Sequence, residues 1–258
     1  MNSINNRLKD LYMNRFSTGE PCFLQILREK RRALNRNQHP AYPFLLKVNE
    51  EKDNNSKCKI IVFGQETNSW EHKVNDSIIP INRSSEFVAK TVDTFMDFYH
   101  DFMSLKVNKN GKKSPFWRTL TKINTEFEAS HIEILWNNIY KLGNKQKRKN
   151  KPVKSIRELE NKYFNVINEE LEIIKPKYLI FLTGPNYESR LEKTIKVKKK
   201  WQVTPEIPIR ELAKFKLVNG LTAYRTYHPN YLHYNKKNNH IDLIIKEIKS
   251  HINSNENE

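Results

Sequence analysis

Four short apolar runs rich in β-prone residues recur along the chain, and segments of helical periodicity separate them. The runs cover residues 59–63, 132–136, 178–182 and 221–227. An alternation of strands and helices is typical of a parallel sheet with helices on both faces. We therefore predict an α/β fold, a three-layer α/β/α arrangement around a central four-stranded parallel sheet.

The segments between these runs carry apolar residues three and four positions apart, which is the spacing of one helix face. Such stripes occupy residues 87–102, 156–174 and 241–248. A further helix is expected to begin at Ser114-Pro115, because serine is a preferred N-cap and proline suits the first helical position.

Residues 1–55 have a different pattern, in which leucines at helical spacing accompany a cluster of arginines and lysines between residues 24 and 36. This pattern predicts a basic amphipathic helix. We expect three parts: a basic helical N-terminal extension (1–55), an α/β/α domain (56–252) and a disordered tail (253–258).

The charge balance points to a polyanionic partner. The chain has 46 Lys and Arg against 29 Asp and Glu, a formal net charge of +17 over 258 residues. Such a surplus favours nucleic acid, because each cation that neutralises a phosphate releases counterions. A genome rich in A and T also enriches lysine, so charge alone does not decide. The 37% hydrophobic content supports a sizeable core and argues against global disorder.

The cysteines and apolar runs exclude several classes of protein. Cys22 and Cys58 are too few for a disulfide framework or a four-thiolate iron–sulfur cluster. No apolar run approaches the length of a membrane span, and the first residues are polar rather than signal-like. No histidine or cysteine pair has zinc-ligand spacing, so we expect no metal and no cofactor. We expect a cytoplasmic protein that does not bind membranes.

Two polar motifs directly follow predicted strands. Gly64-Gln65-Glu66-Thr67-Asn68 follows the run at 59–63, and His228-Pro229-Asn230-Tyr231-Leu232 follows the run at 221–227. Ligands of parallel α/β sheets bind at the carboxyl ends of the strands. The two motifs are therefore expected to place a carboxylate and a histidine at one edge of the sheet.

Both motifs resemble the signatures of the uracil-DNA glycosylase superfamily, which read Gly-Gln-Asp-Pro-Tyr and His-Pro-Ser-Pro-Leu. Gly64 and Gln65 match, and Glu66 is the homologous acid. The histidine, the first proline and the leucine of the second signature also match. The resemblance spans roughly residues 57–250 and concerns a branch without an iron–sulfur cluster. It points to a prokaryotic anti-phage member acting on modified bases.

The resemblance implies roles for the matching residues. Glu66 would align the water that attacks the sugar, and the reference pKa of a glutamate keeps it ionised at neutral pH. His228 would donate a hydrogen bond to O2 of the base as negative charge develops there. Leu232 would enter the duplex as a wedge when the nucleotide is flipped out.

The resemblance also implies a base pocket. It would be formed by Phe63, Gly64 and Gln65, with Asn68 in the place of the family's tyrosine. That tyrosine excludes a substituent at the 5-position of the pyrimidine, so the smaller Asn68 favours a pocket that admits a 5-modified base.

An asparagine after the second predicted strand would read the edge of the flipped base. Asn138 fits the family's Asn-aliphatic-x-Lys pattern best, and Asn137 is the alternative. An amide pairs with either a uracil-type or a cytosine-type edge, so the base stays open. The remaining residues predicted to contact DNA are Asn230, Tyr231, Gly184, Lys145, Lys147, Arg148, Lys149, Lys198, Lys199 and Lys200, the lysines and the arginine in loops.

The function predicted from these features is that of a monofunctional DNA glycosylase, a hydrolase that flips out a modified pyrimidine and leaves an abasic site. The substrate would be a bulky hydroxymethylated or glucosylated base of phage DNA, in antiviral defence. Two alternatives stay open: uracil excision in base-excision repair, and a non-catalytic DNA-binding module on the same fold. The expected partner is double-stranded DNA, bound by a monomer.

Overall fold

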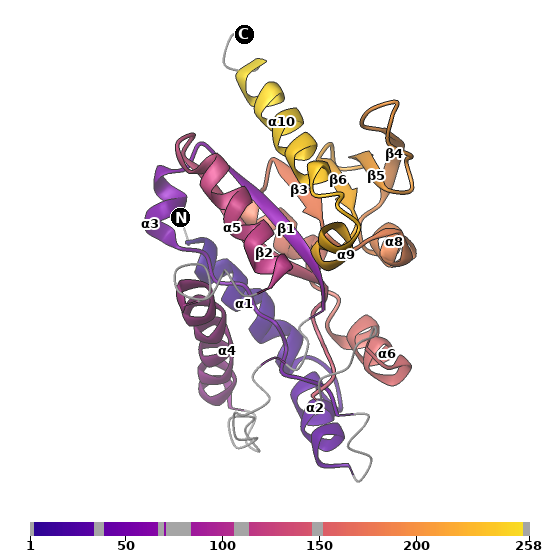
Figure 1. Cartoon of the computed structure of the whole chain (residues 1–258). Helices are drawn as coiled ribbons and strands as arrows, with labels where there is room; N and C mark the ends of the chain where they lie inside the picture. The colour runs from indigo at the N-terminus through magenta and orange to yellow at the C-terminus, as the bar shows by residue number, and fades with distance from the viewer. Residues whose placement is uncertain are drawn as a thin grey trace. The chain divides into compact units, whose positions relative to one another are not determined.

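The computed structural model describes residues 3–33, 39–66, 70, 84–105, 114–145 and 152–254 (Figure 1). These residues belong to two compact units, and each unit has its own core. The first unit combines Met1–Glu50, Glu66–Met103 and Asn138–Ile174, and the second combines Glu51–Gln65, Ser104–Asn137 and Lys175–Glu258.

A mixed sheet forms the centre of the second unit. Within the described residues it has six strands in the order β2-β1-β3-β6-β5-β4. Strand β3 runs parallel to both β1 and β6, whereas β5 runs antiparallel to β6 and β4. The bounds are β1 (Cys58–Glu66), β2 (Ile132–Tyr140), β3 (Tyr178–Phe181), β4 (Val197–Gln202), β5 (Leu212–Leu217) and β6 (Thr222–Thr226).

The α/β class and the positions of the four predicted strands are confirmed, but the prediction of a four-stranded parallel sheet is wrong. Strand β5 was missed although its apolar residues alternate with Lys214 and Lys216. Its hairpin to β6 turns at Asn219-Gly220, where Gly220 has a φ of 85°, and Asn-Gly is a strong hairpin signal. Strand β4 was hidden by its three consecutive lysines, which an edge strand tolerates and which discourage pairing with other chains.

Helices α5 (Pro115–Glu128) and α10 (Asn239–Ser254) are the longest in the second unit, which also contains α3 (Glu50–Asn55), the 3₁₀ turn η4 (Pro185–Tyr187), α8 (Glu188–Thr194) and α9 (Pro229–Tyr234). Ser114 caps α5 as predicted, because its Oγ accepts a hydrogen bond from the Trp117 N–H. Helix α10 packs on β6 and is joined to α5 by the ion pair Lys249–Glu126. In the part of the chain that the structure describes, no helix is long and apolar enough to cross a membrane.

The first unit is built from helices: α1 (Ile4–Ser17), α2 (Phe23–Arg32), α4 (Ser85–Leu105), α6 (Lys154–Tyr163) and α7 (Ile167–Ile174). Its core contains the packed rings of Phe16, Phe23 and Phe164, and the last two stack with centroids 5.1 Å apart. Residues 1–50 therefore share a core with segments from the middle of the chain.

A buried ion pair anchors the first unit. Lys141 and Glu170 are both 0% exposed, and the Lys141 Nζ lies 2.7 Å from Glu170 Oε1. The Tyr12 hydroxyl donates to the same oxygen at 2.6 Å and accepts from the Leu46 N–H at 3.1 Å. Burial lowers the pKa of Lys141, and the neighbouring Glu170 opposes that change. The network ties α1, the segment around Leu46, the stretch after β2 and α7 together.

Candidate functional site

The carboxyl ends of three neighbouring parallel strands carry the polar motifs of the second unit. Gln65 lies near the end of β1, Thr183 and Gly184 follow β3, and His228 follows β6. The Gln65 Nε2 donates to the Thr183 carbonyl at 2.9 Å, and the Gly184 N–H donates to the Thr226 carbonyl at 2.9 Å. The turn after β3 is therefore hydrogen-bonded to the strands on both sides.

Gly184 has a structural reason to be glycine. Its φ is +77°, a conformation that side chains with a Cβ rarely adopt. A Cβ at this position would also lie 3.4 Å from Cδ1 of Tyr227. That distance is an ordinary van der Waals contact, so the positive φ is the reason for the glycine, and the DNA contact predicted for Gly184 stays a prediction.

Glu66, the last residue of β1, is half-buried, and its Oε2 is buried. Burial raises its pKa to about 7. Among the described residues, its buried Oε2 has no hydrogen-bond partner. At neutral pH this carboxyl is therefore less ionised than the reference pKa of a glutamate implies.

His228 is a neutral imidazole with one nitrogen already engaged. It is the N-cap residue of α9, and its Nδ1 accepts a hydrogen bond from the Asn230 N–H at 3.2 Å. Burial lowers its pKa to about 4. Because Nδ1 is the acceptor, the ring proton of the neutral form is on Nε2, and no hydrogen bond joins Nε2–H to another residue in the described part of the chain.

Aromatic residues that the sequence reasoning had assigned only to a helix and a strand gather beside His228. The Phe116 ring stacks on the imidazole, with centroids 5.7 Å apart and planes inclined by 17°. Trp117 and Trp136 pack edge to face at 4.8 Å, and both contact Phe116. The signal in the sequence was the pair Phe116-Trp117, which follows the helix start Ser114-Pro115. The first turn of α5 packs near α9.

Two predicted contact residues are part of the core instead. Phe63 is fully buried and stacks on Phe181 at 4.7 Å, so it does not offer a face to a base. Leu232 is also fully buried and is therefore not available as a wedge. The reason is helix geometry, since Pro229 and Leu232 lie three positions apart on the inward face of α9.

The exposed face of α9 carries tyrosines. Tyr231 is 43% exposed and packs against Tyr227 with ring centroids 4.2 Å apart, and Tyr234 is 81% exposed. Asn230 is exposed as well. Tyr231 and Asn230 thus stay accessible for the DNA contacts predicted for them.

The two candidate base-reading residues are inside the protein. Asn137 is 0% and Asn138 is 1% exposed, within a strand whose nine residues are all buried. Each already interacts within the protein. Recognition of a base edge by Asn138 would therefore require its amide to exchange partners.

The predicted basic loops differ from one another. Residues 198–200 form part of β4, so that prediction of a loop is wrong. Lys198 and Lys199 are exposed, whereas Lys200 forms an ion pair with Glu188. Lys145 is half-buried and its N–H donates to the His39 carbonyl. Asn68, Lys147, Arg148 and Lys149 lie outside the described residues.

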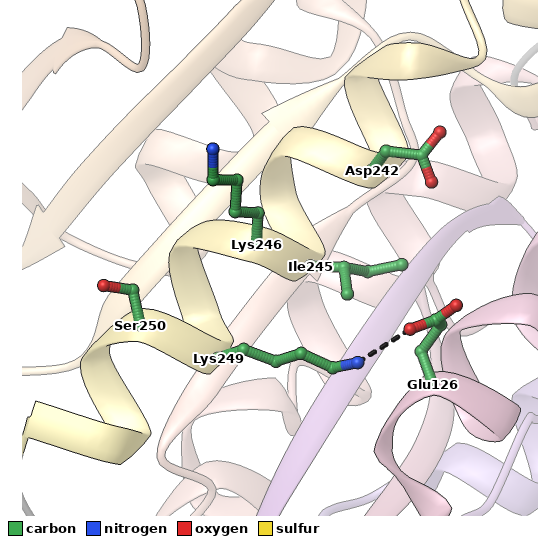
Figure 2. A pocket seen from close by; sticks show the side chains of 6 residues that line it. All are labelled: Glu126, Asp242, Ile245, Lys246, Lys249 and Ser250. Carbon is green, nitrogen blue, oxygen red and sulfur yellow. Dashed lines mark hydrogen bonds and ion pairs between the residues drawn. The ribbon is translucent and has the colours of Figure 1, made fainter.

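A surface pocket of the second unit is separate from these motifs. It lies between α5 and α10 (Figure 2), and the Lys249–Glu126 ion pair lies within it. Two acidic and two basic side chains balance its charge. None of the residues predicted to act on DNA lines it, and its lining consists of Glu126, Asp242, Ile245, Lys246, Lys249 and Ser250.

Neither a search for metal sites nor comparison with known proteins assigns a function to the chain. Across the described ranges, no group of three or more His, Cys, Asp or Glu side chains is placed to hold a metal ion. No protein-family model matches the chain, and no curated protein matches it.

Proposed function

We propose that the protein is a monofunctional DNA glycosylase with a three-layer fold like that of the uracil-DNA glycosylases. The observation that carries the proposal is the state of His228 at the end of β6. Its imidazole is neutral, its Nδ1 is occupied by the Asn230 N–H, and its remaining proton is on Nε2. A preorganised neutral donor is suited to stabilise an oxyanion that develops on a departing base.

In this proposal, His228 donates from Nε2 to O2 of a flipped pyrimidine as the N-glycosidic bond breaks. The electron pair of that bond leaves with the base. A low pKa matters because protonation of Nδ1 would break the hydrogen bond from Asn230 and with it the cap of α9. The imidazole therefore acts as a hydrogen-bond donor and keeps its Nε2 proton.

Glu66 supplies the second role. Its carboxylate form orients a water toward the anomeric carbon and accepts a proton from it while the water oxygen bonds to that carbon. The departing base anion takes up a proton from solvent, so that the products are a neutral free base and an abasic site. The raised pKa of about 7 makes its conjugate base stronger at the cost of a smaller ionised fraction at neutral pH. General bases with pKa values near the working pH use this compromise.

DNA is the proposed partner because of charge and exposure. The chain carries a net charge of +17, and Lys198 and Lys199 are exposed on an edge strand. Cations in such positions contact phosphates and contribute a binding term that falls with salt concentration. The same features support a non-catalytic DNA-binding module, which is the alternative function.

The proposed substrate is a pyrimidine with a bulky 5-substituent, with uracil as the alternative. Asn68, where the family has tyrosine, supports this choice. A panel of duplexes tests it, each with one uracil, 5-hydroxymethyluracil, 5-hydroxymethylcytosine or glucosylated hydroxymethylcytosine. Strand breaks after alkaline treatment report abasic sites. Cleavage at uracil alone would overturn the 5-modified substrate. Salt-sensitive binding without breaks at any base would favour the binding module.

A further inference from the structure

The aromatic ring nearest to His228 comes from a rigid helix start. Ser114 caps α5, and Pro115 occupies its first turn, which places Phe116 one residue further on. Trp117 and Trp136 hold the Phe116 ring at centroid distances of 5.2 and 6.2 Å. Because these rings pack against one another on one unit of the protein, the position of Phe116 is fixed before any ligand binds.

His228 is held from two directions. The Asn230 N–H binds the Nδ1 edge of the ring at 3.2 Å, and Phe116 covers one of its faces. The nearly parallel planes and the 5.7 Å separation describe an offset stack, a favoured arrangement of aromatic rings. An edge contact and a face contact together leave the ring little freedom to rotate.

We propose that Phe116 is a positioning residue for His228, which fixes the direction of the Nε2–H donor and keeps water from one face of the imidazole. This role rests on the proposed function only where it concerns catalysis. The arrangement of the ring itself is a property of the folded protein.

Two effects of the stack on the imidazole oppose each other. An aromatic face attracts a cation, which would raise the pKa of the imidazole. Burial has the opposite effect and lowers the pKa from 6.5 to about 4, so burial is the larger effect. The packed helices α5 and α9 carry charged or titratable groups such as Arg118 and His233, but burial is the cause of the lowered His228 pKa.

The test is a nuclear magnetic resonance titration of the full chain labelled at its eight histidines. The ring ¹⁵N shifts give both the pKa and the tautomer, and His228→Asn assigns the resonance. Phe116→Tyr keeps the ring, Phe116→Leu keeps apolar volume without it, and Phe116→Ala removes both. Phe87→Ala serves as a control for loss of an aromatic ring, because Phe87 is 46% exposed on α4.

We expect wild type, Phe116→Tyr and Phe87→Ala to keep the low pKa and the Nε2–H tautomer. Phe116→Ala should raise the pKa toward 6.5, and Phe116→Leu should keep a low pKa while the two tautomers exchange. His240, buried and bonded to Thr226, reports in the same spectra that the fold is intact. If Phe116→Ala unfolds the chain, the tautomer of His228 in Phe116→Leu tests the positioning role by itself.

Excision kinetics distinguish this inference from the proposed function. With the pKa near 6.5, about three quarters of the His228 rings in Phe116→Ala are protonated at pH 6, and a protonated Nδ1 no longer accepts from the Asn230 N–H that orients the ring. The excision rate of Phe116→Ala relative to wild type at the same pH should therefore be about fourfold lower at pH 6 than at pH 8. An unchanged pKa and tautomer in Phe116→Ala and Phe116→Leu would overturn the positioning role, whatever the activity. A wild-type chain that releases no base would overturn the glycosylase and leave the titration result standing.

Discussion

The buried carboxyl of Glu66 makes the stability of the protein depend on pH in a way that can be measured without knowing the substrate. Its pKa is about 7 in the folded chain and close to the ordinary glutamate value of 4.5 in the unfolded chain. The folded state therefore binds this proton more tightly. The stability that the protonated carboxyl contributes is complete below pH 4.5 and is lost as the pH rises to 7 and above.

Glu66→Gln removes this dependence while keeping the shape of the side chain. The pKa difference of about 2.5 corresponds to about 3 kcal/mol of unfolding free energy. The free energy of unfolding of the variant, minus that of wild type, should therefore increase by about 3 kcal/mol between pH 4 and pH 8. Urea unfolding of both chains across this range measures it, and because both share every other titrating group, the difference isolates Glu66. A difference that stays constant with pH would refute a buried, high-pKa carboxyl.

Three further predictions concern other residues. Leu232→Ala should lower the free energy of unfolding by about 2–5 kcal/mol in urea, since the side chain is fully buried. Tyr231→Ala, at a half-exposed neighbour, should lower it far less. Equal losses would contradict the core position of Leu232. Glu170→Gln should cost about 3–5 kcal/mol, because it removes the carboxylate that pairs with the buried Lys141, and the double variant Lys141→Met, Glu170→Leu should recover much of that loss in the same assay. No recovery would mean that the pair itself stabilises the unit. The double variant Lys198→Ala, Lys199→Ala should weaken binding to any DNA sequence and reduce the slope of log affinity against log salt by about 2, as measured by fluorescence anisotropy. Lys216→Ala on β5 is the matched control. An unchanged slope in the double variant would exclude β4 as a phosphate contact.

Local patterns in the sequence were sufficient where local physics decides the structure. The apolar runs located β1, β2, β3 and β6, and Ser114-Pro115 located the start of α5. The Lys198–Lys200 run was assigned to a loop because its charge masks a strand that is defined by pairing with β5. Pairing is a tertiary property, and a lysine-rich edge strand has no apolar alternation to reveal it.

The candidate site shows the same limit. Motif position predicted that His228 and Gln65 follow parallel strands of one sheet; His228 does follow β6, whereas Gln65 is still part of β1, which continues to Glu66. It did not predict which residues of a motif face the core. Leu232 matches the family pattern but is buried, and Phe116 belongs to no motif but stacks on the histidine. Burial and stacking depend on how α5 and α9 pack, which residue spacing alone does not specify.

The central claim is that Glu66 and His228 cleave an N-glycosidic bond. The most direct measurement is mass spectrometry of the free base released from duplexes containing uracil or a 5-modified pyrimidine, by wild type, Glu66→Gln and His228→Ala. We expect base release by wild type, a decrease of about 10²–10⁴-fold in Glu66→Gln from loss of the general base, and a large decrease in His228→Ala. Release at the wild-type rate by both variants, or by no variant and no wild type on any of these bases, would contradict the account.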